Sequence, residues 1–188
     1  MRVYLPATLA MLLQLNADGE FRPLGGTGFA LTPALREAFV SGDDEELSEV
    51  ALREAARASL RLLAGEAPEP GDADADADLA ADEAAGNPGD TPRLPPRRVV
   101  VAADVDDVTL RPDLDDAVVK VAGPVPLSAI ASVHVDVAEA EDKVRTAVVV
   151  IDAADMGDLD AELAVGDAED FDLAWYATQE LPFLLELL

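Results

Sequence analysis

The spacing of apolar residues in the first third of the chain switches between strand and helix patterns. Val3–Leu5 is a short apolar run typical of a buried strand, and the leucines that follow Thr8 recur every three or four residues, as on one face of a helix that Thr8 caps. Asp43 and Glu46 form a capping-box pattern before a longer helix. The first third therefore predicts strands at 3–5 and 29–31 and helices at 9–15, 34–40 and 43–64.

Regular patterns resume at Arg97. Valine-rich runs and the alternating stretch VHVDV (133–137) are typical of strands, whereas apolar residues return at helical spacing after position 138. This part predicts strands at 97–105, 117–123, 133–137 and 171–177, a helical turn at 126–131, a short acidic helix or turn at 158–168, and helices at 138–154 and 178–188.

Strands and helices in this order predict an α+β fold in which helices cover a mixed β-sheet. The two ends, YLPATLAMLLQL (4–15) and YATQELPFLLEL (176–187), share one tyrosine and four leucines at matching places. Either this match is a coincidence among common leucines, or two related strand–helix halves form a ferredoxin-like sandwich. The apolar end, 181–188, is expected to pack beside the helix at 9–15, because such a tail would aggregate if exposed.

An abrupt change of composition separates the two parts. The segment 66–92 is rich in aspartate, glutamate and proline, and Leu79 is its only large apolar residue, so it cannot bury enough surface to offset the entropy of ordering. The sequence thus predicts one α+β domain built from 1–65 and 93–188, with 66–92 as an acidic disordered linker or surface excursion. A calcium loop at Asp72–Glu83 is the alternative, but Ala77 stands where that loop needs glycine.

The charge balance limits the possible partners. Asp and Glu number 39 against 13 Lys and Arg, which gives a formal net charge of −26. This charge repels nucleic acid and anionic membranes and favours basic partners or cations. The chain has no cysteine, which excludes disulfides, thiolate metal sites and a cysteine nucleophile and suits a cytoplasmic protein. No apolar run is long enough for a membrane-spanning helix.

Carboxylates after Arg145, the last basic residue, are the first candidates for chemistry. A hard cation such as Mg²⁺ or Ca²⁺ needs two or three of them to converge on one point. The candidate metal ligands are Asp155, Asp158, Asp160 and Glu162. The alternative is that these side chains form a solvated helix face.

Three further features have a functional and a structural interpretation. Arg53, Arg57 and Arg61 form a stripe at i,i+4 spacing, which would bind a partner's carboxylates or a phosphate, or else pair with nearby Glu and with the acidic second half. Gly25–Gly28 precedes a helix and forms either an anion-binding loop or an ordinary turn. His134 is the only histidine, either an ordinary strand residue or part of a Ser128–His134–Asp136 triad.

Five stretches resemble an uncharacterised family of small, acidic actinobacterial proteins. They are MRVYLPATLAML, GTGFALTPALRE, RRVVVAADVDDV, GPVPLSAIASVHVD and WYATQELPFLLELL. The resemblance covers 1–64 and 97–188 and implies a cytoplasmic bacterial protein from a genome of high GC content, without implying an activity or any site residue.

The sequence as a whole favours a non-catalytic, cytoplasmic interaction or regulatory protein that docks a basic or apolar protein surface. A small enzyme or hard-cation-dependent hydrolase that uses the acidic region after Asp152 is one alternative. A ligand-binding sensor that uses the Gly25–Gly28 loop is another. No cofactor motif is present, so no cofactor is expected, and the oligomeric state is left open.

Overall fold

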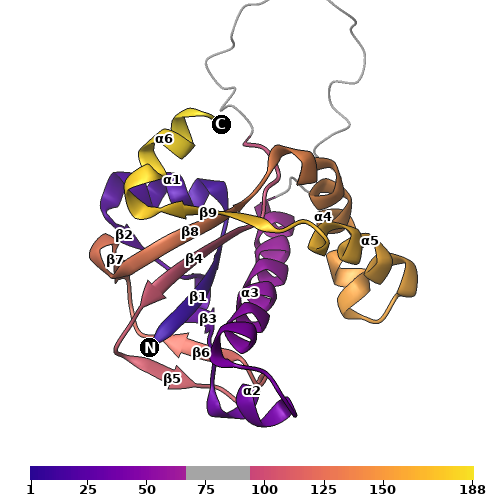
Figure 1. Ribbon diagram of the computed structural model, residues 1–188. Coiled ribbons are helices and arrows are strands. Elements are labelled where there is room, and N and C mark those ends of the chain that lie inside the picture. Colours follow the sequence, from indigo (N-terminus) through magenta and orange to yellow (C-terminus); the bar gives the residue numbers. More distant parts are fainter. Residues whose placement is uncertain (67–93) are drawn as a thin grey trace, which may run out of the picture.

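The computed structural model describes residues 1–66 and 94–188 and contains one seven-stranded β-sheet with helices on both faces (Figure 1). The strand order is β5-β6-β3-β1-β4-β8-β9, and every neighbouring pair is antiparallel. The strands of this sheet are β1 (Arg2–Ala7), β3 (Thr27–Phe29), β4 (Val99–Asp104), β5 (Val108–Leu110), β6 (Val118–Val121), β8 (Ile130–Asp136) and β9 (Leu173–Ala177). A separate two-stranded sheet pairs β2 (Glu20–Phe21) with β7 (Val125–Pro126).

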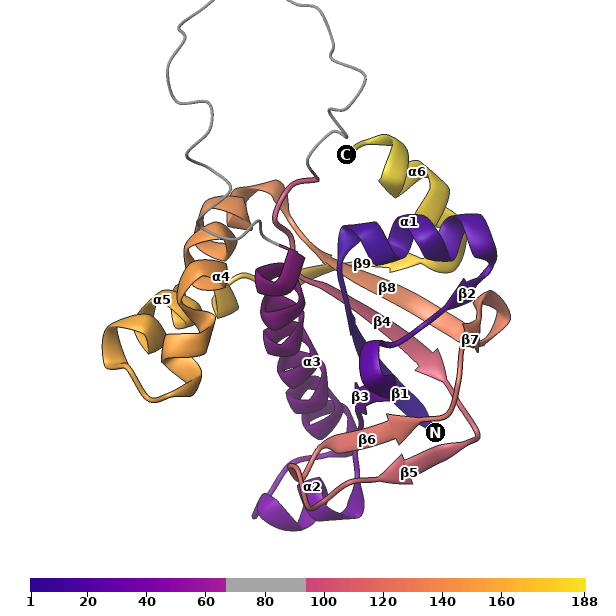
Figure 2. The same cartoon turned by 180° about the vertical axis from the view of Figure 1, so that it is seen from behind.

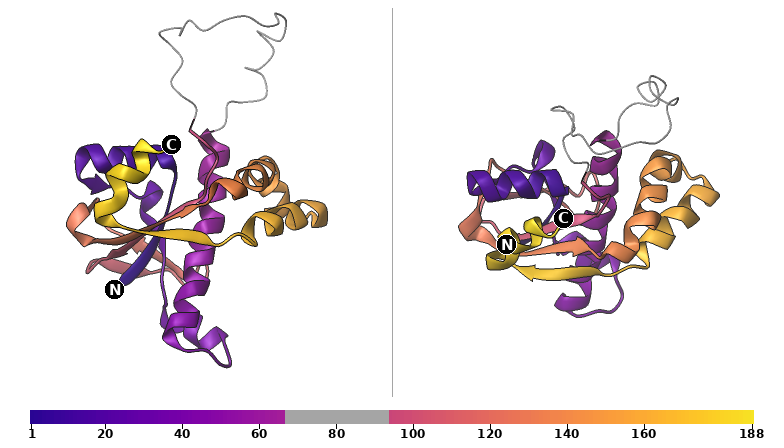
Figure 3. Two further views of the ribbon diagram at one scale, coloured as in Figure 1. Left: turned by 45° about the horizontal axis from the view of Figure 1, so that its top comes forward. Right: turned by 90° about the horizontal axis from the view of Figure 1, so that it is seen from above.

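Six α-helices and four short 3-10 turns accompany the strands of the described residues. The α-helices are α1 (Leu9–Asp18), α2 (Pro33–Ala38), α3 (Asp44–Glu66), α4 (Glu141–Asp155), α5 (Leu159–Glu169) and α6 (Leu181–Glu186). Seen from behind, α3 crosses the sheet and the α4–α5 hairpin stands beside it, away from α1 and α6 (Figures 2 and 3). The predicted α+β class is confirmed, whereas the predicted mixed sheet is wrong, because all the strand pairs are antiparallel.

The connections explain why the sheet is not a ferredoxin-like sandwich. β3, α3 and β4 form a split β-α-β unit with β1 between the two strands, which is one half of that arrangement. The described residues provide no second such unit, since β8 and β9 are direct neighbours and β2 pairs with β7 outside the main sheet. The two similar chain ends do both fold as a strand followed by a helix, and α1 and α6 pack on the same face.

Side chains of β1 alternate between the two faces of the sheet and so divide the core. Val3 and Leu5 belong to the main core, where the leucines of α1 and of α6 cover one face. Tyr4 faces the other side, where it packs against the cluster under α3. A third cluster joins the end of α3 to α4 and α5 through Leu60 and Ile151.

Local signals predicted the starts of α1 and α3. The hydroxyl of Thr8 accepts a hydrogen bond from the Met11 backbone N–H, and Gly19 ends α1 with a left-handed φ of 71°. At the start of α3 the Asp43 carboxylate accepts from the backbone N–H of Glu46 at 3.0 Å, and the Glu46 carboxylate accepts from the Asp43 N–H at 3.2 Å. The capping box inferred from the sequence is therefore confirmed.

Small residues let α3 lie close to the sheet. Ala51, Ala55 and Ser59 are fully buried on its inner face. The Ser59 hydroxyl donates to the carbonyl of Ala7 at 2.7 Å and accepts from the N–H of Val99 at 3.0 Å. One side chain of α3 thus joins the end of β1 to the start of β4.

Some sequence expectations differ from the structure or lie outside it. The strand expected at 29–31 runs instead from Thr27 to Phe29, and β5 was not expected. The linker at 66–92 and the calcium-loop alternative lie outside the described residues, except that Glu66 is the last residue of α3. None of the described helices has the length and apolar content needed to cross a membrane.

Candidate functional site

Two hollows along the N-terminal half of α3 share Glu49 and Leu52, and we call them together the α3 furrow. The sheet-side hollow, about 310 Å³, is lined by Arg2, Tyr4, Glu45, Ser48, Glu49, Leu52, Ala102, Ser132, His134 and Trp175. The hairpin-side hollow, about 450 Å³, is lined by Glu49, Val50, Leu52, Arg53, Glu54, Ala56, Arg57, Arg98, Gly166, Glu169, Asp170, Phe171, Asp172 and Leu173. The furrow therefore runs from the open sheet face to the foot of the α4–α5 hairpin.

Strand register assembles the floor of the sheet-side hollow. Ala102 stands opposite both Tyr4 of β1 and Ser132 of β8, and the next row pairs His134 with Trp175 of β9. Trp175 is the most prominent of these side chains, because 60% of its surface is exposed. An aromatic ring held at the rim of a hollow is suited to stacking or to contact with a cation.

The histidine does not belong to the predicted triad. His134 Nε2 lies 3.2 Å from the hydroxyl of Ser132, while Ser128 is an exposed residue of the turn before β8. Asp136 is buried against Arg98. The predicted triad is therefore wrong: the serine that contacts His134 is Ser132, and the Asp136 carboxylate binds Arg98. Burial lowers the pKa of His134, and the charge of Arg2 lowers it further, so the imidazole is neutral at pH 7.

Arg98 and Asp136 form a buried ion pair between the furrow and the sheet. Their side chains are 3% and 0% exposed. The guanidinium donates to both Asp136 oxygens at 2.9 and 2.8 Å and to the Phe171 carbonyl at 2.8 Å, and the Arg98 N–H donates to Asp136 at 2.7 Å. The pair therefore fixes the segment that enters β9 against β4 and β8.

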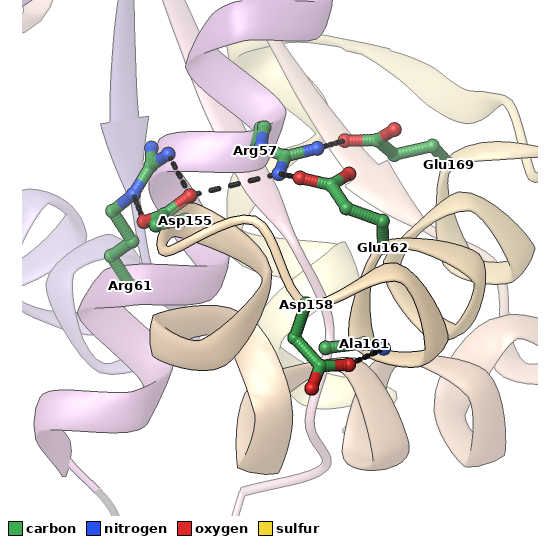
Figure 4. A network of polar contacts seen from close by, with 7 residues as sticks. All are labelled: Arg57, Arg61, Asp155, Asp158, Ala161, Glu162 and Glu169. Atoms are coloured by element: carbon green, nitrogen blue, oxygen red, sulfur yellow. Dashed lines mark hydrogen bonds and ion pairs between the residues drawn. The ribbon is translucent and has the colours of Figure 1, made fainter.

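The arginine stripe divides between two tasks (Figure 4). The half-buried Arg57 lies 3.0 Å from Glu162 and 3.3 Å from Glu169, both on α5. Arg61 makes a bidentate contact with Asp155, the last residue of α4, at 2.6 and 2.8 Å. These contacts hold the α4–α5 hairpin against α3, which is the structural interpretation of the stripe.

Arg53 is different, because its partner lies on α3 itself: Glu49, one turn earlier, at 2.7 Å. The structure therefore gives all three arginines carboxylate partners within the chain.

The four candidate metal ligands serve separate purposes. Arg61 lowers the pKa of Asp155 by its hydrogen bonds, and Glu162 binds Arg57. Asp158 caps α5 by accepting from the Ala161 N–H at 2.9 Å (Figure 4). Asp160 is exposed in the first turn of α5. Within 1–66 and 94–188, no three histidine or carboxylate side chains are grouped so that they could hold a metal ion.

The Gly25–Gly28 loop lies apart from the furrow and is shaped by packing. Gly25 and Gly26 have left-handed φ values of 61° and 68° in a tight turn. A Cβ on Gly26 would stand 2.7 Å from the carbonyl of Val121, and one on Gly28 would stand 2.9 Å from a Leu5 methyl group. The glycines therefore permit close approach of neighbouring strands.

The furrow has a surplus of negative charge. Four of its carboxylates have no cationic partner among the described residues: Glu45, Glu54, Asp170 and Asp172. Partial desolvation raises the pKa of Glu54, which still has an exposed surface, and the negative charge of Asp115 contributes to the same shift. The surroundings of Glu54 therefore disfavour the charged form of its carboxylate.

The sequence pattern of a family of unknown function, DUF6912, matches residues 1–185. The chain belongs to DUF6912. The match confirms the resemblance to an uncharacterised family and includes every strand and all the furrow residues of this DUF6912 protein. No curated protein and no solved structure matches the chain.

Replacement of Arg57 by glutamine is expected to loosen the hairpin of this DUF6912 protein. The Glu162 and Glu169 carboxylates would lose their shared cation, so the free energy of unfolding should fall by roughly 1–2 kcal/mol, between the values for exposed and buried pairs. Arg53→Gln is the matched control, with an expected loss below about 0.5 kcal/mol. Urea denaturation measures both, and equal losses would contradict the assignment of Arg57 as the residue that holds the hairpin.

Glu54→Gln is expected to stabilise the protein at neutral pH. A folded-state pKa above the unfolded value means that ionisation costs stability, and this cost is present above the folded pKa and absent below the unfolded pKa. The melting temperature of the variant should therefore exceed that of the wild type at pH 7 and match it near pH 3. Glu49→Gln, which breaks the pair with Arg53, is the control and should not stabilise at either pH.

Proposed function

We propose that this DUF6912 protein is a non-catalytic, cytoplasmic interaction protein whose α3 furrow binds a basic segment of another protein. The observation that carries the proposal is the position of Trp175, an exposed aromatic side chain at the rim of a hollow that also contains carboxylates. A lysine or arginine of the partner would lie against the indole ring and reach Glu45 or Glu49 in the same hollow.

The charges of the furrow support a cationic partner. Each arginine that lines it already has a carboxylate within the chain, in the pairs Arg2–Asp104, Arg53–Glu49, Arg57–Glu162 and Arg98–Asp136. The carboxylates without such a partner in the described structure therefore set the sign of the local field. A cation beside Glu54 would offset the cost of keeping this carboxylate charged, since part of that cost arises from burial.

The net charge of the whole chain acts in the same direction. At −26 it attracts basic proteins over long distances and repels nucleic acid and anionic membranes. The lack of cysteine suits the reducing cytoplasm.

The two alternative functions have less support in the geometry. The carboxylates suggested for a hard cation are occupied by Arg57 and Arg61 or by a helix cap, except Asp160. The loop suggested for a sensor is shaped by strand packing around Gly26 and Gly28.

Site-specific photo-crosslinking tests the proposal. A benzoylphenylalanine in place of Trp175, in the full chain expressed in its native cells, is expected to crosslink to a protein segment rich in lysine and arginine. The combined Glu45→Gln and Glu54→Gln changes should weaken this crosslink, and so should added salt, because attraction between exposed charges is screened.

The matched control carries the same photo-reactive residue at Leu114, which is comparably exposed, at 62%, and does not line the furrow. Crosslinks from position 175 that are no more frequent than those from position 114, or that join segments without basic residues, would overturn the proposal.

A further inference from the structure

β9 is an edge strand that lacks the usual protection of an edge. It ends the sheet and pairs only with β8 in the described part of the chain, and none of its five residues is buried (Figures 1 and 3). Its sequence, LAWYA, contains no charge, proline or glycine. The opposite edge strand, β5, has only three residues, and shortness is one common means of protecting an edge. β9 is longer and has no charged side chain within the strand, although acidic residues flank it on both sides.

Hydrogen bonding in β8 shows which backbone groups of β9 point outward. The N–H of Asp136 donates to the carbonyl of Arg98 beside β4, so by alternation Val133 and Val135 direct their backbone groups toward β9. Their partners in register are Tyr176 and Ala174. The N–H and C=O groups of the intervening residues, Leu173 and Trp175, therefore point away from the sheet.

Ala177 has the same orientation as Trp175, and its N–H is bound at 2.7 Å by the Glu180 carboxylate. The end of the outward edge is thus closed by a side chain, whereas no residue of 1–66 or 94–188 forms a backbone hydrogen bond to its centre. Trp175 stands at that centre, where its backbone is at the edge and its indole lines the α3 furrow.

We propose, building on the function proposed above, that the basic partner segment binds as an additional β-strand along β9. Main-chain hydrogen bonds to Leu173 and Trp175 would supply affinity, and the side chains on alternate positions would enter the furrow beside Trp175. Asp170 and Asp172 precede β9 and Glu180 follows it. The segment that fits is therefore extended, with β-branched or apolar residues at its centre and lysine or arginine at both ends.

A second copy of the chain fits this edge poorly. Antiparallel pairing of two β9 strands centred on Trp175 would bring the acidic residues that flank each strand, Asp170, Asp172 and Glu180, near those of the other copy. Repulsion between these carboxylates opposes the pairing, and each copy carries a formal charge of −26.

Hydrogen exchange measured by NMR on the full chain tests the inference without any mutation. In the free protein the amides of Leu173 and Trp175 should exchange rapidly, while those of Ala174 and Tyr176 are protected. The probe is the peptide Arg-Arg-Thr-Val-Thr-Val-Thr-Arg-Arg. We expect it to shift the Trp175 indole resonance and to slow exchange of the Leu173 and Trp175 amides at least tenfold. An otherwise identical peptide with aspartate in place of every arginine should do neither.

The outcomes separate the two proposals. A shift of the indole without protection of the two amides would overturn strand addition and leave binding in the furrow standing. Lack of an indole shift would count against both. Protection in the free protein that grows with protein concentration would show a second copy at this edge, and protection independent of concentration would show that the chain covers β9 itself; either result overturns the inference.

A pair of variants gives an independent test. Trp175→Ala removes the indole and keeps the outward N–H, whereas Trp175→Pro removes both and breaks no hydrogen bond to β8. We expect the alanine variant to bind the basic peptide several-fold more weakly than the wild type and the proline variant at least tenfold more weakly than the alanine variant. Equal affinities of the two variants, with native circular dichroism, would contradict pairing through the backbone.

Discussion

Arg98→Met is expected to lower the free energy of unfolding by roughly 3–5 kcal/mol, a large fraction of the stability of a typical domain. The change leaves the Asp136 carboxylate buried, with its side chain 0% exposed and without the guanidinium that neutralises it. It also removes the hydrogen bond to the Phe171 carbonyl, which helps to hold the entry into β9. Chemical denaturation measures the loss.

Two controls make this result specific to burial. Arg2→Met breaks a similar arginine–aspartate contact with Asp104, but on the surface, so its cost should be below about 1 kcal/mol. The double change Arg98→Met with Asp136→Leu removes both charges and should recover much of the lost stability, because a buried pair is worth little relative to apolar residues of similar size. A double variant less stable than Arg98→Met would contradict this account.

Features set by neighbours in sequence were predicted well. The caps of α1 and α3 depend on contacts between residues at most three positions apart, such as Thr8 with Met11 and Asp43 with Glu46, so their signals are visible in the sequence. The contact of His134 with Ser132 is equally local, because alternate residues of a strand share a face, but Ser128 was predicted instead and this contact was missed.

Features set by strand order were not predictable. The apolar runs show that strands exist but do not show which strands become neighbours. The sheet was therefore expected to be mixed, whereas all its strand pairs are antiparallel. The exposure of Trp175 has the same origin, because it follows from the place of β9 at the end of the sheet. The candidate binding furrow was therefore missed.

Contacts between charged residues were predicted only in part. The i,i+4 spacing identified the arginine stripe, and the acidic second half was already one of its expected partners. Which carboxylates meet Arg57 depends on how the α4–α5 hairpin docks, more than ninety residues later in the chain. Two of the arginine partners, Asp155 and Glu162, were predicted as candidate metal ligands, because spacing alone does not distinguish a cation site from a set of arginine partners.

Deletion of 181–188 is expected to leave an insoluble or molten protein. Leu181 and Leu184 of α6 are buried in the main core together with Leu9 and Leu12 of α1, as expected from the apolar end of the chain. Each buried leucine contributes roughly 1.5–3 kcal/mol, and the deletion would also expose the α1 leucines that they cover. The loss is then comparable to the stability of a small domain.

Point variants within α6 separate core packing from surface docking. Leu184→Ala should lower the free energy of unfolding by roughly 2–5 kcal/mol, the range for a leucine removed from a core. Leu187→Ala is the matched control, since Leu187 is 85% exposed and its replacement should cost less than about 0.5 kcal/mol. Phe183 is exposed as well, so only one side of the apolar tail belongs to the core. A soluble truncated protein that unfolds cooperatively would show that α6 is dispensable to the fold, and the exposed side of the helix would then be the first place to look for a second contact with a partner.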